Sequence, residues 1–141
     1  MHTYRYFLCY NILMQTAFMK RIISLEYLFA AVFVAIFFVT VGGFDWWWLP
    51  VLFIVFDVST VGYLINNHVG ALTYNIGHSI IGPTLLASIY IVTNNQLLLF
   101  ITLLWLFHIF VDRALGYGMK HTKGFEHTHL GKIGNASKKK V

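Results

Sequence analysis

Four long apolar stretches dominate the chain, and polar positions inside them are few. Each stretch approaches or reaches the roughly 20 residues that an α-helix needs to cross the hydrocarbon core of a bilayer. The connections are short, so consecutive helices must run antiparallel. The pattern predicts an all-α integral membrane fold, an antiparallel four-transmembrane-helix bundle. Its helices are expected at residues 22–41, 46–65, 72–92 and 97–115.

Composition supports a lipid environment. Hydrophobic residues make up 58% of the chain and charged residues 11%, against about 45–50% and about 25% in soluble domains. A water-soluble fold of this size would expose large apolar patches. The basic residues do not spread over a polar face, so no nucleic-acid partner is expected. Cys9 is the single cysteine, which excludes an intrachain disulfide.

The positions of the positive charges predict orientation. Ten Lys and Arg residues lie before the first predicted helix or at and after the end of the last, and none lies in the three loops. Cytoplasmic segments retain Lys and Arg, and an even number of helices returns the chain to the side on which it began. We therefore expect a multi-pass protein of the cell (inner) membrane with cytoplasmic N and C termini.

Three regions follow from this arrangement. Residues 1–21 form an N-terminal segment, residues 22–115 the four-helix transmembrane domain, and residues 116–141 a basic cytoplasmic tail. The lysines of the tail are expected to bind anionic lipids. Met19 is a plausible start of its own, because Met19-Lys20-Arg21 leads directly into the first helix. The residues before it are then either outside the natural product or an interfacial helix.

Polar residues inside the predicted helices share one level. Ionisable side chains are costly in lipid, so they usually face the bundle interior and mark a function or a pairing. With the predicted orientation, five of them fall about 5–12 Å from the cytoplasmic helix ends at 1.5 Å per residue. His108 and Asp112 are spaced i, i+4, which places them on one face of the fourth helix. The five residues are Glu26, Asp57, His78, His108 and Asp112.

The polar layer admits three interpretations. Carboxylates and imidazoles converging in a bundle can bind a divalent metal such as Zn, Fe or Mn, and a metal-bound water would allow hydrolysis of a lipid-like substrate. Alternatively, the layer is a proton or ion relay, or part of a transporter. In the third interpretation it is structural or partner-binding, and its members pair across helices. The chain has no P-loop, G-x-S-x-G or H-E-x-x-H motif and no Cys-His nucleophile pair, so a Ser or Cys hydrolase is not expected.

Residues around the layer have expected roles. Tyr74 lies one turn before His78 and adds a phenol to the site. Arg113 lies near a helix end and is expected to extend toward the lipid headgroups. Pro83 is expected to kink the third helix. The tail histidines His121, His127 and His129 are expected to be exposed, although they could also cap the layer or bind metal.

Several segments carry a family resemblance: Asp57-Val-Ser-Thr-Val-Gly-Tyr63-Leu, Gly70-Ala-Leu-Thr-Tyr74-Asn75-Ile-Gly-His78, His108-Ile-Phe-Val-Asp112-Arg113-Ala-Leu-Gly116-Tyr117-Gly118 and Thr128-His129-Leu130-Gly131. From about Lys20 to Gly134 the chain resembles the bacterial membrane family called domain of unknown function 4260. The resemblance implies a multi-pass membrane protein and no established activity. The stretch before Met19 departs from the family pattern. Matching positions are Asp57, Tyr74, Asn75, His78, His108, Asp112, Arg113 and His129.

Overall fold

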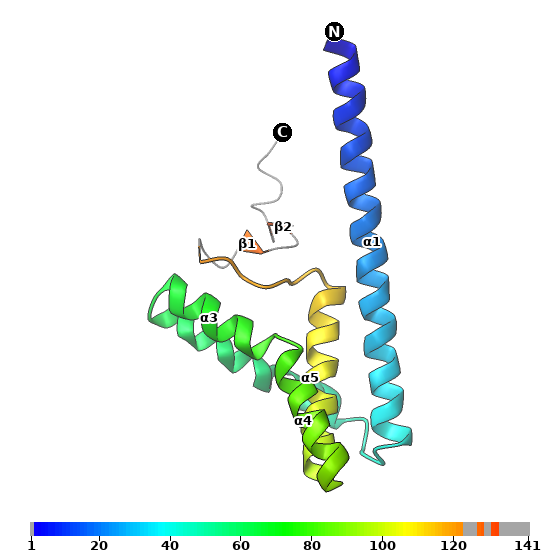
Figure 1. Ribbon diagram of the computed structural model, residues 1–141, viewed down its shortest axis with the longest axis vertical. Coiled ribbons are helices and arrows are strands. Elements are labelled where there is room, and N and C mark those ends of the chain that lie inside the picture. The colour runs from blue at the N-terminus through cyan, green and yellow to red at the C-terminus, as the bar shows by residue number, and fades with distance from the viewer. Residues whose placement is uncertain (1, 123–126, 129–130, 133–141) are drawn as a thin grey trace.

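The protein is almost entirely helical in a computed structural model that describes residues 2–122, 127–128 and 131–132 (Figure 1). Side chains are described for residues 14–122 and 128. In chain order the elements are α1 (His2–Thr40), α2 (Trp48–Val51), the 3-10 helix η1 (Phe53–Leu64), α3 (Asn67–Gly77), α4 (Ile81–Thr93) and α5 (Gln96–Ala114). A short antiparallel pair follows, formed by β1 (His127–Thr128) and β2 (Gly131–Lys132).

Helices long and apolar enough to cross a membrane are the main feature of the fold. Among the described residues there are 3 candidate spans, Met14–Thr40, Asn67–Thr93 and Gln96–Ala114. The segment Trp48–Leu64 is apolar but shorter. The sequence-based expectation of an all-helical chain with membrane-length apolar helices is therefore confirmed.

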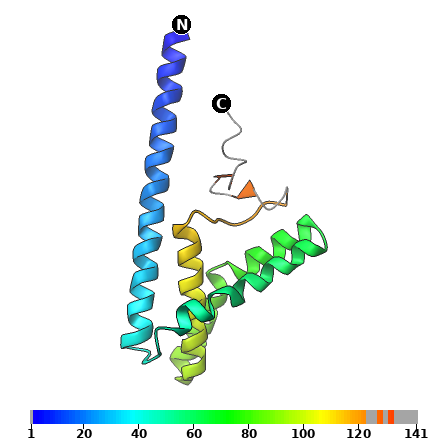
Figure 2. The same ribbon diagram turned by 180° about the vertical axis from the view of Figure 1, so that it is seen from behind.

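Helix α1 is longer than the pattern predicted. It begins at His2 rather than at residue 22 and runs for 39 residues without interruption. At 1.5 Å per residue it is about 58 Å long, roughly twice the thickness of a hydrocarbon core. Its N-terminal half projects beyond the end of α5, on the side where the chain leaves α5 (Figures 1 and 2).

The apolar core lies between α1 and α5, which pack along each other. The Phe38 side chain is fully buried there, and its ring centre lies 5.0 Å from that of Phe44 and 5.5 Å from that of Phe100. At the opposite end of the pair, the Ser24 hydroxyl donates a hydrogen bond to the Ala114 carbonyl. The core residues are Val34, Phe38, Leu49, Leu99, Leu103 and Leu104.

The second predicted helix forms two different elements. After the short α2, the chain continues as η1 for 12 residues, which is long for a 3-10 helix. This segment is rich in Val, Ile and Thr, whose branched side chains lose freedom in an α-helix. The Thr60 hydroxyl also donates a hydrogen bond to the Asp57 carbonyl at 2.6 Å, a local bond that competes with α-helical pairing.

The third predicted helix is interrupted rather than kinked. Helix α3 ends at Gly77, and α4 begins at Ile81. Two backbone carbonyls at the break accept hydrogen bonds from side chains of α5. Trp105 Nε1 donates to the Gly77 oxygen at 2.6 Å, and Arg113 Nη2 donates to the His78 oxygen at 3.3 Å. Pro83 lies in the first turn of α4, where its missing N–H costs little. Tertiary hydrogen bonds therefore stabilise the break.

The helices do not form the regular antiparallel bundle that the short connections suggested. Elements η1 and α3 pack against each other, and α4 packs against α5. The η1–α3 pair lies crosswise to α1 and α5 (Figures 1 and 2). Glycine permits this close pairing, because a Cβ on Gly62 would approach the Gly70 Cα to 3.1 Å. The interruption of the third helix allows the pair to turn away from the bundle axis.

Candidate metal centre

Four potential metal ligands meet where the crossed pair reaches α5. Asp57 comes from η1, His78 follows the last residue of α3, and both remaining ligands, His108 and Asp112, lie one turn apart on α5. One donor atom from each residue lies within 4.8 Å of all the others. The break after Gly77 is what frees His78 to face α5. Tertiary structure therefore brings together residues that are 55 positions apart, from 57 to 112.

The spacing of the donor atoms resembles a coordination sphere. The Nε2 atoms of His78 and His108 are 3.0 Å apart. His78 Nε2 is 3.3 Å from an oxygen of Asp112 and 3.5 Å from one of Asp57, while the corresponding distances from His108 Nε2 are 3.9 Å and 3.7 Å. Ligands at about 2.0–2.1 Å from a tetrahedral ion are about 3.3–3.4 Å apart. The observed distances bracket that value.

The surroundings of His78 orient its ring. Its Nδ1 lies 3.0 Å from the Tyr74 carbonyl oxygen and 3.4 Å from the Ser59 hydroxyl. Because a carbonyl only accepts, Nδ1 carries the proton, and the Nε2 lone pair faces the other ligands. The Tyr74 ring stacks on the imidazole with the ring centres 3.8 Å apart. A hydrogen-bonded Nδ1 is the usual arrangement for a metal-binding histidine.

His108 and the two carboxylates differ in exposure. The His108 side chain is fully buried, with the Phe53 and Phe56 rings at 4.5 and 5.6 Å. The side chain of Asp112 is 14% exposed and that of Asp57 is 39% exposed. Two carboxylates and two imidazoles in partly buried surroundings form a donor set suited to a divalent cation.

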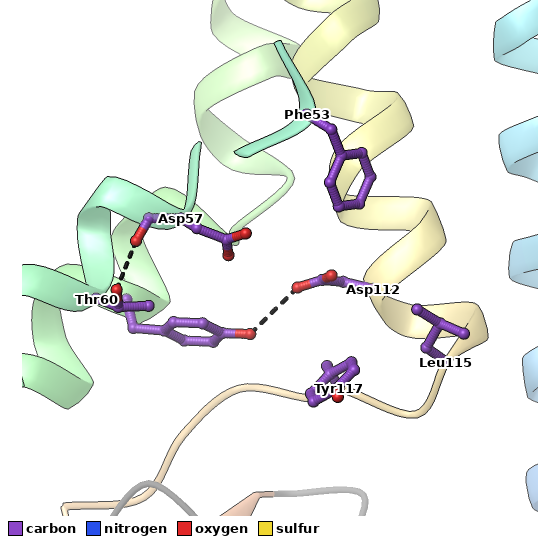
Figure 3. Close-up of a pocket in the computed structure, with 7 residues that line it drawn as sticks. Phe53, Asp57, Thr60, Asp112, Leu115 and Tyr117 are labelled. Atoms are coloured by element: carbon purple, nitrogen blue, oxygen red, sulfur yellow. Dashed lines mark hydrogen bonds between the residues drawn. The ribbon is translucent and has the colours of Figure 1, made fainter. Parts of the chain in front are cut away.

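A cavity of about 260 Å³ opens beside the two carboxylates. Asp57 and Asp112 extend toward each other across it, and Phe53, Leu115 and Tyr117 surround them (Figure 3). The Tyr74 hydroxyl donates to an Asp112 oxygen at 3.3 Å. His78 and His108 are not among the lining residues, so a small molecule in the cavity would meet the carboxylates first. The complete lining is Phe53, Asp57, Thr60, Tyr74, Asp112, Leu115 and Tyr117.

The remaining sequence-predicted residues lie in different places. Glu26 is exposed on α1 and does not join the four ligands. Arg113 does not extend outward as expected: it is 8% exposed and donates to the His78 carbonyl. Asn75 binds the backbone of the segment after α5. His121 is exposed, and His129 lies outside the described residues.

Lys120 is the most informative residue that the sequence did not indicate. It was expected among the lipid-binding lysines of the tail, but its side chain is only 4% exposed. The Asn75 side chain holds it through two hydrogen bonds, from Nδ2 to the Lys120 oxygen at 2.9 Å and from the Lys120 N–H to Oδ1 at 2.7 Å. Burial lowers the pKa of the Lys120 amine, and the Asp112 charge raises it. Ser59 and Trp105 were also missed, because nothing local marks their roles.

Fold and site together define a small helical protein with membrane-length apolar helices and a buried cluster of two histidines and two aspartates. The chain belongs to the family described as a domain of unknown function (DUF4260), whose model matches residues 20–133. This confirms the resemblance inferred from the motifs. Comparison with curated proteins and with solved structures gives no match.

Proposed function

We propose that the protein binds one divalent transition metal and uses it to hydrolyse a lipid-like substrate. The ligands are Asp57, His78, His108 and Asp112, and the ion is Zn, Fe or Mn, for which imidazole and carboxylate are suitable donors. The observation that supports this most is the 3.0 Å separation of the two Nε2 atoms. Two Nε2 atoms at this distance share either a proton or a cation, and the two carboxylates beside them complete a donor set for a metal ion.

The cavity supports a reactive rather than a purely structural ion. Catalytic metal sites keep one coordination position open to water or substrate. Here the cavity borders Asp57 and Asp112, and a divalent ion would lower the pKa of a bound water to about 7. The Tyr74 hydroxyl donates a hydrogen bond to Asp112 and would orient that carboxylate toward the ion.

The proposed location is the inner membrane, with both termini in the cytoplasm. The three candidate spans and the clustering of Lys and Arg at the chain ends support this placement. The basic tail would contact anionic lipids.

Elemental analysis of detergent-purified protein tests the metal directly. Wild-type protein should retain about one equivalent of Zn, Fe or Mn after removal of loosely bound ions, and His108→Ala and Asp112→Asn should lose it. His68→Ala and Asp45→Asn change the same residue types at exposed positions and should retain it. If the wild-type protein contains no metal even after reconstitution with Zn, Fe and Mn in turn, the proposal is wrong.

The short distance between the imidazoles also favours a second candidate, a proton relay. A proton shared between His78 and His108 would account for the same distance, and both carboxylates lie within 4 Å of His78. Proton flux into vesicles containing purified protein distinguishes the two. Flux that survives metal removal and disappears in Asp112→Asn would favour the relay. If His108→Ala and Asp112→Asn change neither the metal content nor the flux, a structural role is favoured.

A further inference from the structure

The cavity beside the proposed centre has a lining of two kinds. Asp57, Thr60 and Tyr74 lie on one side, and the Asp112 carboxylate faces them from the other (Figure 3). Phe53, Leu115 and Tyr117 add aromatic and aliphatic surface around these polar groups (Figure 3). A small polar solute would leave the apolar surface unused. An amphipathic molecule matches both kinds of surface, with its polar group between the carboxylates.

The cavity also lies at the end of a candidate span. The span formed by α5 ends at Ala114, and the lining residues Leu115 and Tyr117 follow immediately, with exposed fractions of 69% and 37%. In a bilayer, the end of a span is at the level of the lipid headgroups. The cavity therefore lies at the depth where the polar and apolar parts of a lipid meet.

A buried cation lies one aromatic ring away from this cavity. Lys120 Nζ is 5.0 Å from the centre of the Tyr74 ring and 5.7 Å from that of Tyr117, and both rings line the cavity. The Tyr74 ring also stacks against His78. The Asn75 side chain fixes the Lys120 backbone in this place. In low-dielectric surroundings a charge so near acts strongly on the contents of the cavity.

We infer that the cavity binds the phosphate-bearing head of a membrane amphiphile, and that Lys120 is the residue that selects for its negative charge. The inference rests on the proposed metal centre, which supplies the second positive charge. A metal ion with a nearby lysine is a common arrangement for binding phosphoryl oxygens. The Phe53 and Leu115 side chains would contact the first carbons of the apolar chains.

Manganese-loaded protein in detergent provides the test, because bound Mn²⁺ broadens the ³¹P resonance of a nearby phosphate. The main probe is dihexanoyl phosphatidic acid below its micellar concentration. Inorganic phosphate tests for recognition of free phosphate, and dihexanoylglycerol and octanoate, added as competitors, test an uncharged amphiphile and a carboxylate. We expect saturable broadening with phosphatidic acid, weaker broadening with inorganic phosphate, and little competition from the other two.

The matched variants are Lys120→Met and Lys20→Met, the second at an exposed position on α1. Lys120→Met should bind phosphatidic acid about tenfold more weakly with unchanged manganese content, as expected for loss of one nearby positive charge in low-dielectric surroundings. Lys20→Met should bind like wild type. Equal binding by Lys120→Met, or equal competition by dihexanoylglycerol, would overturn the inference.

Two further results separate the inference from the proposed function. Equal affinity for inorganic phosphate and phosphatidic acid would overturn the lipid part of the inference. Wild-type protein that retains none of Zn, Fe and Mn would overturn the metal centre itself. The ligand preference of the wild type is measured without any variant, so the inference can be refuted even if Lys120→Met fails to fold.

Discussion

The imidazoles of His78 and His108 meet at their Nε2 atoms, 3.0 Å apart, although one follows the end of α3 and the other lies within α5. Both rings are almost completely buried. His78 already uses Nδ1 for the Tyr74 carbonyl, so its Nε2 lone pair faces His108. A buried arrangement of this kind is stable only when a cation or a proton occupies the space between the two nitrogens.

Metal removal should therefore lower the thermal stability of the protein. We expect the melting temperature in detergent to fall with a chelator and to recover with Zn²⁺. Free metal at 100 times its dissociation constant should raise the free energy of unfolding by about 2.7 kcal/mol. His108→Ala should show no response to either treatment, whereas exposed His68→Ala should respond like wild type. A metal response in His108→Ala equal to that of wild type would contradict the assignment of this ligand.

Trp105→Phe tests the hydrogen bond that stabilises the helix break. The change removes the Nε1–H donor to the Gly77 carbonyl and retains most of the ring. An unsatisfied buried acceptor costs about 1–3 kcal/mol of unfolding free energy, and displacement of His78 should also weaken metal binding. Trp47→Phe, at a position that is 40% exposed, is the control for both measurements. Unchanged stability and affinity would show that the bond is unimportant.

Gly62→Ala should separate η1 from α3. A new Cβ would clash with the Thr73 hydroxyl and lie 3.1 Å from both the Gly70 Cα and the Val69 carbonyl oxygen, and overpacking of this kind typically costs about 1–3 kcal/mol. Metal content should fall because Asp57 moves with η1. Gly43→Ala is the informative control: its φ of +68° makes alanine strained but the space around it is open, so it should lose stability and keep metal.

Asn75→Ala should release the segment after α5 from α3. Both hydrogen bonds between the Asn75 side chain and the Lys120 backbone disappear. We expect the Lys120 amide to exchange with deuterium at least tenfold faster, since its acceptor is lost. Asn66→Ala removes the cap at the other end of α3, where the side chain accepts from the Val69 N–H, and should leave Lys120 exchange unchanged.

Lys120 should make stability increase with pH in alkaline solution. Burial lowers its pKa in the folded state from the ordinary value of 10.5, so between the two values the unfolded chain binds more protons. Stability then rises with pH across that window. Melting temperatures of wild type and Lys120→Met, measured from pH 8 to 10.5, should converge as the pH increases. A constant difference would contradict the pKa direction.

Prediction of the helices from the sequence was most accurate where the local sequence alone determines the structure. Helix α5 was expected at residues 97–115 and occupies Gln96–Ala114, because its apolar run is uninterrupted and Asn95 provides an N-cap to the Leu97 N–H. The break after Gly77 was not predicted as such. It depends on Trp105 and Arg113, which reach it only in the folded chain.

The candidate site was also predicted in part, and the errors again concern residues whose positions depend on tertiary contacts. Depth within the predicted helices correctly grouped Asp57, His78, His108 and Asp112. Depth alone cannot tell which side of a helix faces the centre, so Glu26 was included although its side chain is exposed on α1. Lys120 was assigned to the tail, because its burial depends on Asn75, 45 residues earlier.

The crossed arrangement of the η1–α3 pair and α5 gives the centre a mechanical role. Asp57 and His78 belong to the pair, and His108 and Asp112 belong to α5. An ion bound by all four would link the η1–α3 pair to α5, two parts of the chain that run in different directions. Loss of the ion would then remove one link between the η1–α3 pair and α5, beside the hydrogen bonds from Trp105 and Arg113.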